Sequence, residues 1–199
     1  TTAEGAIVTT DDAAMAKAMK LWKFHGVERD AWKAYAGASK PATTYDVVLP
    51  GFKYNLTDLH AALGVHQLAK LPAFNKRRAE IAARFMEGLA GTPGLTLPGL
   101  AKYDHTHPWH LFVVLVPKGT RPAFIEKMNA LGVGTGIHFE AVHTSTFYRE
   151  KFGGAEGQCP VAEDVCSRCV SLPIYPNMTD ADAERTVKAV KEAVGGARG

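Results

Sequence analysis

The sequence has 199 residues, of which 46% are hydrophobic and 22% are charged, with a formal net charge of +3. These values exclude a disordered chain, and the length is sufficient for one good core or two modest ones. The basic residues are scattered apart from Lys76–Arg78, so we expect no nucleic-acid partner. No apolar run approaches the roughly 18 to 20 residues that span a bilayer, so we expect no membrane partner and a cytoplasmic protein.

The N-terminal part of the chain predicts a strand and then a helix. Residues 5–10 read GAIVTT, which is typical of a short strand, and Asp11 or Asp12 is an expected helix cap. The apolar stripe of that helix, which we expect to be buried, consists of Met15, Ala18, Met19 and Trp22. Residues 27–50 have no sustained period and predict a loop.

Two helices are predicted in the middle of the chain. Thr57 is an expected N-cap of the first, in which Leu59, Ala62 and Leu63 should face inward. Pro72 should begin the second, because proline favours the first turn of a helix. The buried stripe of the second helix is expected to consist of Ile81, Phe85 and Leu89, before a stop at residues 91–93.

The C-terminal part mixes strands and helices. Residues 109–116 and 133–139 predict strands on either side of a helix that begins near residue 120. That helix should bury Phe124, Met128 and Leu131. Residues 179–182 resemble a capping box for the last helix. The buried stripe of the last helix should consist of Ala183, Val187, Val190 and Val194. This order indicates an α/β or α+β protein with a boundary near residues 70–95.

Two groups of side chains could suggest a metal site. His105, His107 and His110 cannot all lie on one face of a strand, so three-ligand geometry is poor. Cys166 and Cys169 have the spacing of half a zinc or redox motif, but no second ligand pair follows them. We therefore expect no metal, and we expect the cysteines, including Cys159, to be packing or surface thiols.

Three segments resemble one enzyme family. TTAEGAIVTTDD at residues 1–12, GFKYNLTDLHAALGVHQL at 51–68 and GTGIHFEAVH at 134–143 are similar to the DegT/DnrJ/EryC1/StrS sugar-nucleotide aminotransferases. The resemblance implies an α/β fold, as a fragment of a fold-type-I aminotransferase, with pyridoxal phosphate as cofactor and a homodimer as assembly. It further implies that residues 1–72 end the large cofactor domain and carry a dimer loop, and that residues 73–199 form the small C-terminal α/β domain.

The same resemblance bears on the catalytic residue. In the family, the lysine that binds the cofactor covalently lies three residues before the position matched by Thr1, so this chain is expected to contain no catalytic residue. The partner of this chain would then be the missing N-terminal half of the enzyme. Three explanations stay open, namely a truncated piece of an ordinary enzyme, one half of a split enzyme, and a non-catalytic dimerisation or binding module.

The resemblance also implies site residues. In the family a G-x-N-Y-R loop reaches the cofactor phosphate of the neighbouring subunit, and here Lys53 occupies the asparagine position and Asn55 the arginine position. Either could be the phosphate ligand. His138 and His143 are expected to bind substrate, although a satisfied structural histidine is the alternative. The implied substrates are L-glutamate, which becomes 2-oxoglutarate, and a nucleotide-linked 4-keto sugar. The motifs look most similar to enzymes that make UDP-4-amino-4-deoxy-L-arabinose, which implies a UDP-4-keto-pentose.

Overall fold

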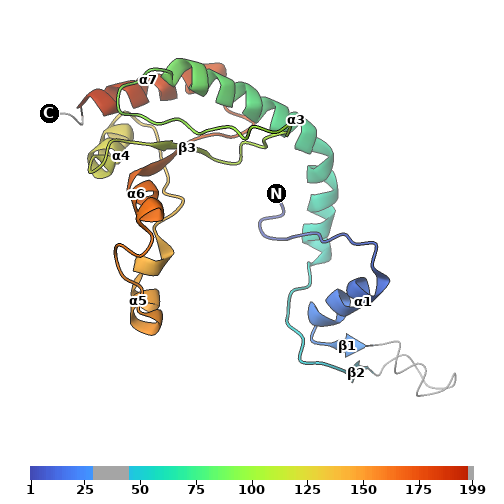
Figure 1. Cartoon of the computed structure of the whole chain (residues 1–199). Coiled ribbons are helices and arrows are strands. Elements are labelled where there is room, and N and C mark those ends of the chain that lie inside the picture. The colour runs from blue at the N-terminus through green and yellow to red at the C-terminus, as the bar shows by residue number, and fades with distance from the viewer. Residues whose placement is uncertain (29–44, 197–199) are drawn as a thin grey trace, which may run out of the picture. The chain divides into compact units, whose positions relative to one another are not determined.

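The computed structural model describes residues 1–28 and 45–196 (Figure 1). The chain divides into two compact units, Thr1–Lys70 and Leu71–Gly199. Among the described residues, the buried apolar side chains that form the core all belong to the second unit. The assignment of residues 1–72 to a cofactor domain and of residues 73–199 to a small domain stays a prediction.

The first unit contains α1 (Ala13–Trp22), β1 (Val27–Glu28), β2 (Asp46–Val47) and the first part of α3 (Asp58–Leu89). Asp12 caps α1 as expected, because its carboxylate accepts the N–H groups of Ala14 and Met15 at 2.8 and 3.0 Å. The strands β1 and β2 pair antiparallel. Most of the predicted loop at 27–50 falls on residues 29–44, which lie outside the described residues.

Three expectations for the first unit are wrong. Residues 5–10 have irregular backbone instead of a strand. No residue of α1 is buried, and Trp22 of its predicted core stripe is 43% exposed. Leu59, which we expected to face inward, is 82% exposed. The reason is that Gly26 is the only buried residue within the described part of this unit, so no core is present there to cover these faces.

The long helix α3 contains Pro72 in its interior. Thr57 caps this helix, because its hydroxyl accepts the N–H of His60 at 3.4 Å. The expectation of two helices with Pro72 at the start of the second is wrong, since one helix of 32 residues continues through the proline. A proline in the first turn and a proline inside a helix look alike in a hydrophobic pattern, although only the second removes a backbone hydrogen bond.

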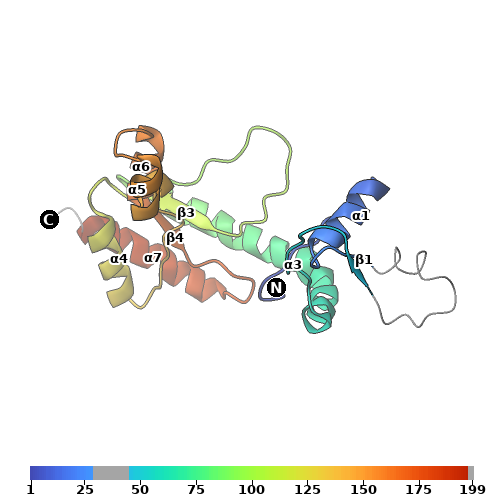
Figure 2. The same ribbon diagram turned by 90° about the horizontal axis from the view of Figure 1, so that it is seen from below.

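The second unit is built on two antiparallel strands with helices on both sides. It contains the second part of α3, β3 (Phe112–Leu115), α4 (Arg121–Ala130), η1 (Val142–Thr144), α5 (Thr146–Phe152), α6 (Pro160–Arg168), β4 (Cys169–Leu172) and α7 (Asp180–Gly196). Phe112 lies opposite Leu172 in the β3–β4 ladder. Figure 1 shows α7 on one side of these strands and α5 and α6 on the other, and Figure 2 shows the latter two helices together.

The expectation of a strand at residues 133–139 is wrong. Only Gly136 pairs there, through an isolated bridge to Ser171 of β4. The Gly136 N–H donates to the Ser171 carbonyl at 3.1 Å, and the Ser171 N–H donates back to the Gly136 carbonyl at 2.8 Å. The segment therefore follows the sheet edge for one residue pair and then leaves it.

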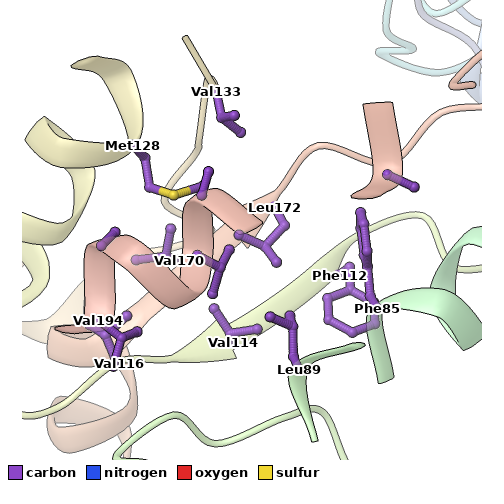
Figure 3. Close-up of a cluster of buried hydrophobic side chains, with 14 of the residues drawn as sticks. Phe85, Leu89, Phe112, Val114, Val116, Met128, Val133, Val170, Leu172 and Val194 are labelled. Carbon is purple, nitrogen blue, oxygen red and sulfur yellow. The ribbon is translucent and has the colours of Figure 1, made fainter. Parts of the chain in front are cut away.

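The core of the second unit joins α3, β3, β4, α4 and α7 (Figure 3). The rings of Phe85 and Phe112 meet edge-on with their centroids 5.1 Å apart, a favoured arrangement for buried aromatic pairs. The predicted inward faces of this unit are confirmed as buried for Ile81, Phe85, Leu89, Phe124, Met128, Ala183, Val190 and Val194. Leu131 and Val187 are only partly buried against the same cluster.

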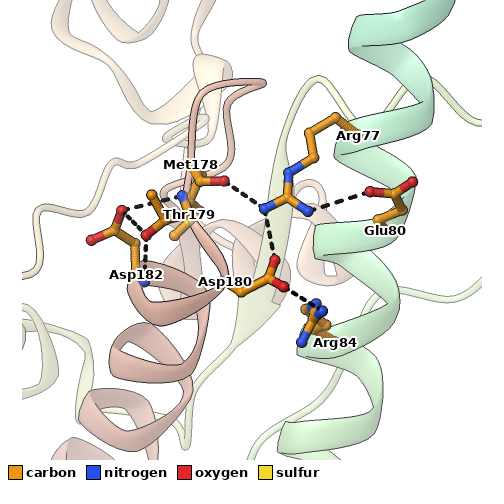
Figure 4. A network of polar contacts seen from close by, with 7 residues as sticks. All are labelled: Arg77, Glu80, Arg84, Met178, Thr179, Asp180 and Asp182. Atoms are coloured by element: carbon orange, nitrogen blue, oxygen red, sulfur yellow. Dashed lines mark hydrogen bonds and ion pairs between the residues drawn. The ribbon is translucent and has the colours of Figure 1, made fainter.

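The start of α7 has the predicted capping box. The Asp182 carboxylate accepts the Thr179 O–H at 2.6 Å and the Thr179 N–H at 3.2 Å, and the Thr179 hydroxyl accepts the Asp182 N–H at 3.1 Å (Figure 4). These bonds satisfy two N–H groups that would otherwise have no partner at the helix start. They also lower the pKa of Asp182, chiefly through the Thr179 hydroxyl.

Asp180 connects α7 to α3. Its carboxylate accepts hydrogen bonds from Arg77 at 2.8 Å and from Arg84 at 2.6 Å (Figure 4). Arg77 also donates to the Met178 carbonyl at 2.7 Å. The hydrogen bond from Arg77, and then the charge of Arg84, hold the pKa of Asp180 below its usual value.

We expect Asp180→Asn to destabilise the second unit at neutral pH but not in acid. Because the pKa of Asp180 is lowered in the folded state, its contribution to stability is present above the ordinary aspartate pKa of about 4 and is lost as pH falls through the lowered value. Thermal midpoints between pH 7 and pH 2 would measure this. Asp104→Asn is the matched control, and an equal loss of midpoint for both variants would contradict the prediction.

Candidate functional site

The loop that carries Lys53 is fixed to the end of α1 by backbone hydrogen bonds. The Phe52 N–H donates to the Trp22 carbonyl at 2.7 Å, and the Tyr54 N–H donates to the Lys23 carbonyl at 2.7 Å. Lys53 pairs with Phe24 through an isolated antiparallel bridge. The loop is therefore an ordered part of the first unit, with a set direction for each side chain.

Gly51 makes this close approach feasible. A Cβ at this position would lie 2.3 Å from the Gly26 nitrogen and 2.8 Å from the Leu21 carbonyl oxygen, both of which are backbone atoms. No rotation of a side chain could relieve such a contact. The absence of a side chain at Gly51, the first residue of the G-F-K-Y-N motif, thus allows the loop to lie against the end of α1.

Side chains alternate across this loop. The rings of Phe52 and Tyr54 stack with centroids 5.1 Å apart, while the Lys53 ammonium lies 4.5 Å from the centroid of the Phe24 ring. Lys53 is exposed and pairs with no carboxylate within the described residues. Asn55 is half-buried, and its amide has no hydrogen-bond partner in that part of the chain. The loop therefore offers one unpaired cation and one free amide.

The His138 ring is held by the sheet edge. Its Nδ1 lies 2.8 Å from the Ser171 hydroxyl oxygen, and Ser171 is buried. A Cβ on Gly136 would lie 2.8 Å from Cε1 of the same ring, so a larger residue at this position would displace the ring. His138 itself is exposed, and its Nε2 has no hydrogen-bond partner among the described residues. The ring thus presents Nε2 from a fixed position.

His143 is held by a carboxylate. Its Nε2 lies 2.8 Å from Oε1 of Glu163, and the two side chains are 20% and 23% exposed. Hydrogen bonds to Glu163 from the Gly157 N–H, then from His143 and then from the Cys159 N–H lower the pKa of this carboxyl. The contribution of Glu163 to stability is consequently present above its ordinary pKa and is lost as pH falls through the lowered one.

The predicted site residues fall into two groups. Lys53 and Asn55 belong to the first unit, and His138 and His143 belong to the second. No hydrogen bond or ring contact joins the two histidines to each other in the described residues. Sequence reasoning missed Ser171 and Glu163, which hold these rings. The position of Glu163 in the first turn of a helix that begins at Pro160 indicates only that it accepts backbone N–H groups, and it gives no sign of a histidine partner.

The other histidines and the cysteines form no cluster with metal-ligand character. Within residues 1–28 and 45–196, no group of three His, Cys, Asp or Glu side chains could hold a metal ion. The Nδ1 atom of His105 lies 2.8 Å from the Tyr103 carbonyl, and that of His107 accepts the Trp109 N–H at 2.9 Å. The cysteines are free thiols, of which Cys169 is buried and Cys159 exposed.

Comparison with protein families identifies the chain. The model of the DegT/DnrJ/EryC1/StrS aminotransferase family matches residues 1–191. The chain belongs to this family. The uncharacterized protein MJ1066 of Methanocaldococcus jannaschii is 42% identical over 198 residues, which are 98% of this chain and 50% of that protein. The chain therefore spans about half the length of this relative.

Two solved structures have the same fold as this chain. A putative sugar aminotransferase, Spr1654 from Streptococcus pneumoniae, in its PMP form gives a TM-score of 0.84 at 27% identity, over 99% of this chain and 50% of that one. DesV from S. venezuelae gives 0.77 at 31% identity, over 92% of this chain and 45% of that one. The expected α/β aminotransferase fold is thus confirmed.

Enzymes of the DegT/DnrJ/EryC1/StrS family depend on pyridoxal phosphate, and Spr1654 has been solved in PLP and PMP forms. The donors on the Gly51–Asn55 loop fit such a cofactor, because an unpaired ammonium and a free amide are suitable ligands for a phosphate dianion.

None of the helices that the structure describes is both long and apolar enough to cross a membrane.

Proposed function

We propose that the intact protein transfers an amino group from L-glutamate to a nucleotide-linked 4-keto sugar, with a UDP-4-keto-pentose as the substrate. Membership of the aminotransferase family carries this proposal. The ordered loop with Lys53 and Asn55 supports it, because these donors suit the cofactor phosphate. This chain supplies groups that bind and orient, whereas the lysine that binds the cofactor belongs to the N-terminal half, and the enzyme works as a homodimer.

Each site residue has a defined task in this proposal. Pyridoxal phosphate, when bound, supplies the electron sink that makes amino transfer feasible. Lys53 would offset the charge of the phosphate in the neighbouring subunit, and Lys53 and Asn55 would orient it as hydrogen-bond donors. His138 would contact substrate through Nε2, since Nδ1 is already engaged by Ser171, and His143 would contact it through Nδ1, since Nε2 is engaged by Glu163.

A second candidate function is a dimerisation or binding module without catalysis. Its support is the number of apolar side chains that the first unit leaves exposed, because apolar side chains that gather into a large exposed patch mark an interaction site. The most exposed of its aliphatic side chains are Ile7 at 79%, Val8 at 69%, Leu59 at 82%, Val65 at 71% and Leu68 at 62%. Such a surface also suits an enzyme subunit that packs against its own N-terminal half.

One experiment separates the two functions. The intact protein would be incubated with the UDP-4-keto-pentose and L-glutamate, and 2-oxoglutarate and the UDP-4-amino sugar would be measured together by mass spectrometry. The enzyme forms both in equal amounts. A protein that dimerises in sedimentation experiments but forms neither product would support the binding module and contradict the proposed transfer.

We expect that no single lysine of this chain binds pyridoxal phosphate covalently. The described lysines are all exposed or half-exposed, and burial is one of the main ways in which an enzyme activates a lysine amine. Incubation of this chain with the cofactor, borohydride reduction and peptide mapping would test the expectation. One stoichiometric adduct on one residue would contradict it, whereas scattered low-level labelling agrees with it.

A further inference from the structure

The Glu163 carboxylate accepts hydrogen bonds from three donors. Its Oε1 accepts the Cys159 N–H at 3.0 Å and lies 2.8 Å from Nε2 of His143, and both carboxylate oxygens accept the Gly157 N–H at 2.9 Å. The two backbone donors would place the carboxylate even if His143 were absent. The ring therefore binds to a group whose position is already set.

The backbone of His143 is fixed as well. It lies in η1, where the Thr144 hydroxyl donates to the Ala141 carbonyl at 2.7 Å and the Ser145 hydroxyl donates to the Val142 carbonyl at 2.8 Å. A Cβ on Gly154 would lie 2.1 Å from the His143 carbonyl oxygen, so the chain after α5 passes directly over this residue. Both ends of the His143 side chain are thus held.

The chemistry of a carboxylate then defines which ring nitrogen is available. An ionised carboxylate only accepts hydrogen bonds, so Nε2 must carry the proton in the contact with Glu163. Nδ1 has no hydrogen-bond partner within residues 1–28 and 45–196. It is the atom through which this ring can bind a further molecule, and its direction is determined by the Glu163 contact.

We propose that Glu163 is a positioning residue, which holds the His143 ring through Nε2 so that Nδ1 is presented to the nucleotide sugar. This inference rests on the proposed substrate-binding role of His143. Glu163 is not expected to touch the substrate, because its acceptor sites face the two backbone N–H groups and the ring. A carboxylate that orients an imidazole in this way lowers the cost of fixing the ring when ligand binds.

The test is a double-mutant cycle on ligand affinity. UDP-xylose, a stable UDP-pentose, would be titrated into the intact protein by calorimetry for wild type, Glu163→Ala, His143→Ala and the double variant. We expect Glu163→Ala to raise the Kd about tenfold, the size of one lost hydrogen bond of about 1.4 kcal/mol. In the His143→Ala background the same change should alter the Kd by less than about twofold, since the two residues act as one unit.

Two further variants distinguish positioning from general folding. Glu163→Gln keeps an acceptor of the same shape and should restore most of the affinity. Asp164→Ala removes a neighbouring carboxylate of α6, which pairs with Arg168 at 3.0 Å and has no contact with His143, so the Kd should stay unchanged. If the effects of Glu163→Ala and His143→Ala multiply, or if Asp164→Ala weakens binding equally, Glu163 is only a structural residue and the inference is wrong.

The outcome is separable from that of the proposed function. Calorimetry measures binding without turnover, so a protein that shows the coupled loss of affinity but no amino transfer contradicts the proposed reaction and leaves the role of Glu163 standing. If the protein transfers the amino group but the effects of Glu163→Ala and His143→Ala on Kd multiply, the proposed reaction is supported and the role of Glu163 is contradicted. Wild-type protein that does not bind UDP-xylose overturns the inference.

Discussion

Replacement of Lys53 or Asn55 by alanine should weaken retention of pyridoxal phosphate in the intact enzyme by about five- to a hundredfold. Each donor to a phosphate oxygen contributes about 1 to 3 kcal/mol, and the contribution is greater where the donor is charged. Lys53 is the stronger candidate on charge, because its ammonium has no carboxylate partner within the described residues. Cofactor Kd values from absorbance titrations of the apo enzyme would measure the effect for each variant.

The position of the Lys53 ammonium requires a control. It lies over the Phe24 ring, so Lys53→Ala also removes a cation–π contact that contributes about 0.5 to 1 kcal/mol at an exposed site. Lys20→Ala removes an exposed lysine from α1 and should leave cofactor affinity unchanged. Thermal midpoints measured without cofactor would reveal any purely structural effect of Lys53→Ala. Unchanged affinity in both Lys53→Ala and Asn55→Ala would refute the assignment of this loop.

The parts of the fold that the sequence predicts correctly are those specified by neighbouring residues. Asp12 and the Thr179–Asp182 pair act through hydrogen bonds to residues two or three positions away, so their spacing contains the whole interaction. The buried stripe of α3 from Ile81 to Leu89 repeats every four residues and faces a core within the same unit. Local pattern and burial agree at these places.

The failures occur where burial depends on other parts of the protein. The stripe of α1 has the same periodicity as the stripe of α3, yet Trp22 is exposed because the described part of its unit provides no core. Periodicity shows which side chains lie on one face of a helix, but it does not show that something covers that face. Pro72 illustrates a second limit, since the same residue favours the first turn and is tolerated inside a long helix.

The candidate site was likewise predicted only where a local motif specifies it. His138 and His143 were found through a short motif, but the groups that orient their rings lie 33 and 20 residues away in the sequence. Ser171 belongs to a buried strand and Glu163 to a polar helix, and neither has a local pattern that indicates a histidine partner. Contacts of this kind arise from the pairing of β4 with Gly136 and from the turn of η1, which only the folded chain brings together.

We expect His138→Asn to leave the fold intact and to lower catalytic efficiency toward the keto sugar by tenfold or more. An asparagine amide reaches the position of Nδ1, so it can keep the hydrogen bond to the buried Ser171 hydroxyl, and the stability should change by less than about 1 kcal/mol. The same amide cannot reach the position of Nε2. The variant therefore removes the one ring atom that is available for substrate, and a lost transition-state hydrogen bond lowers kcat/KM.

Thermal midpoint and steady-state kinetics on the same preparation would measure both halves of this expectation. His105→Asn is the matched control, because His105 is exposed and contacts the Tyr103 carbonyl at a position outside the proposed site. Ser171→Ala should give a smaller loss of efficiency than His138→Asn, since it frees the ring without removing Nε2. A large loss of stability in His138→Asn with unchanged kcat/KM per folded molecule would contradict this expectation. It would show that His138 is a structural histidine whose contact with Ser171 stabilises the sheet edge and does not serve substrate binding.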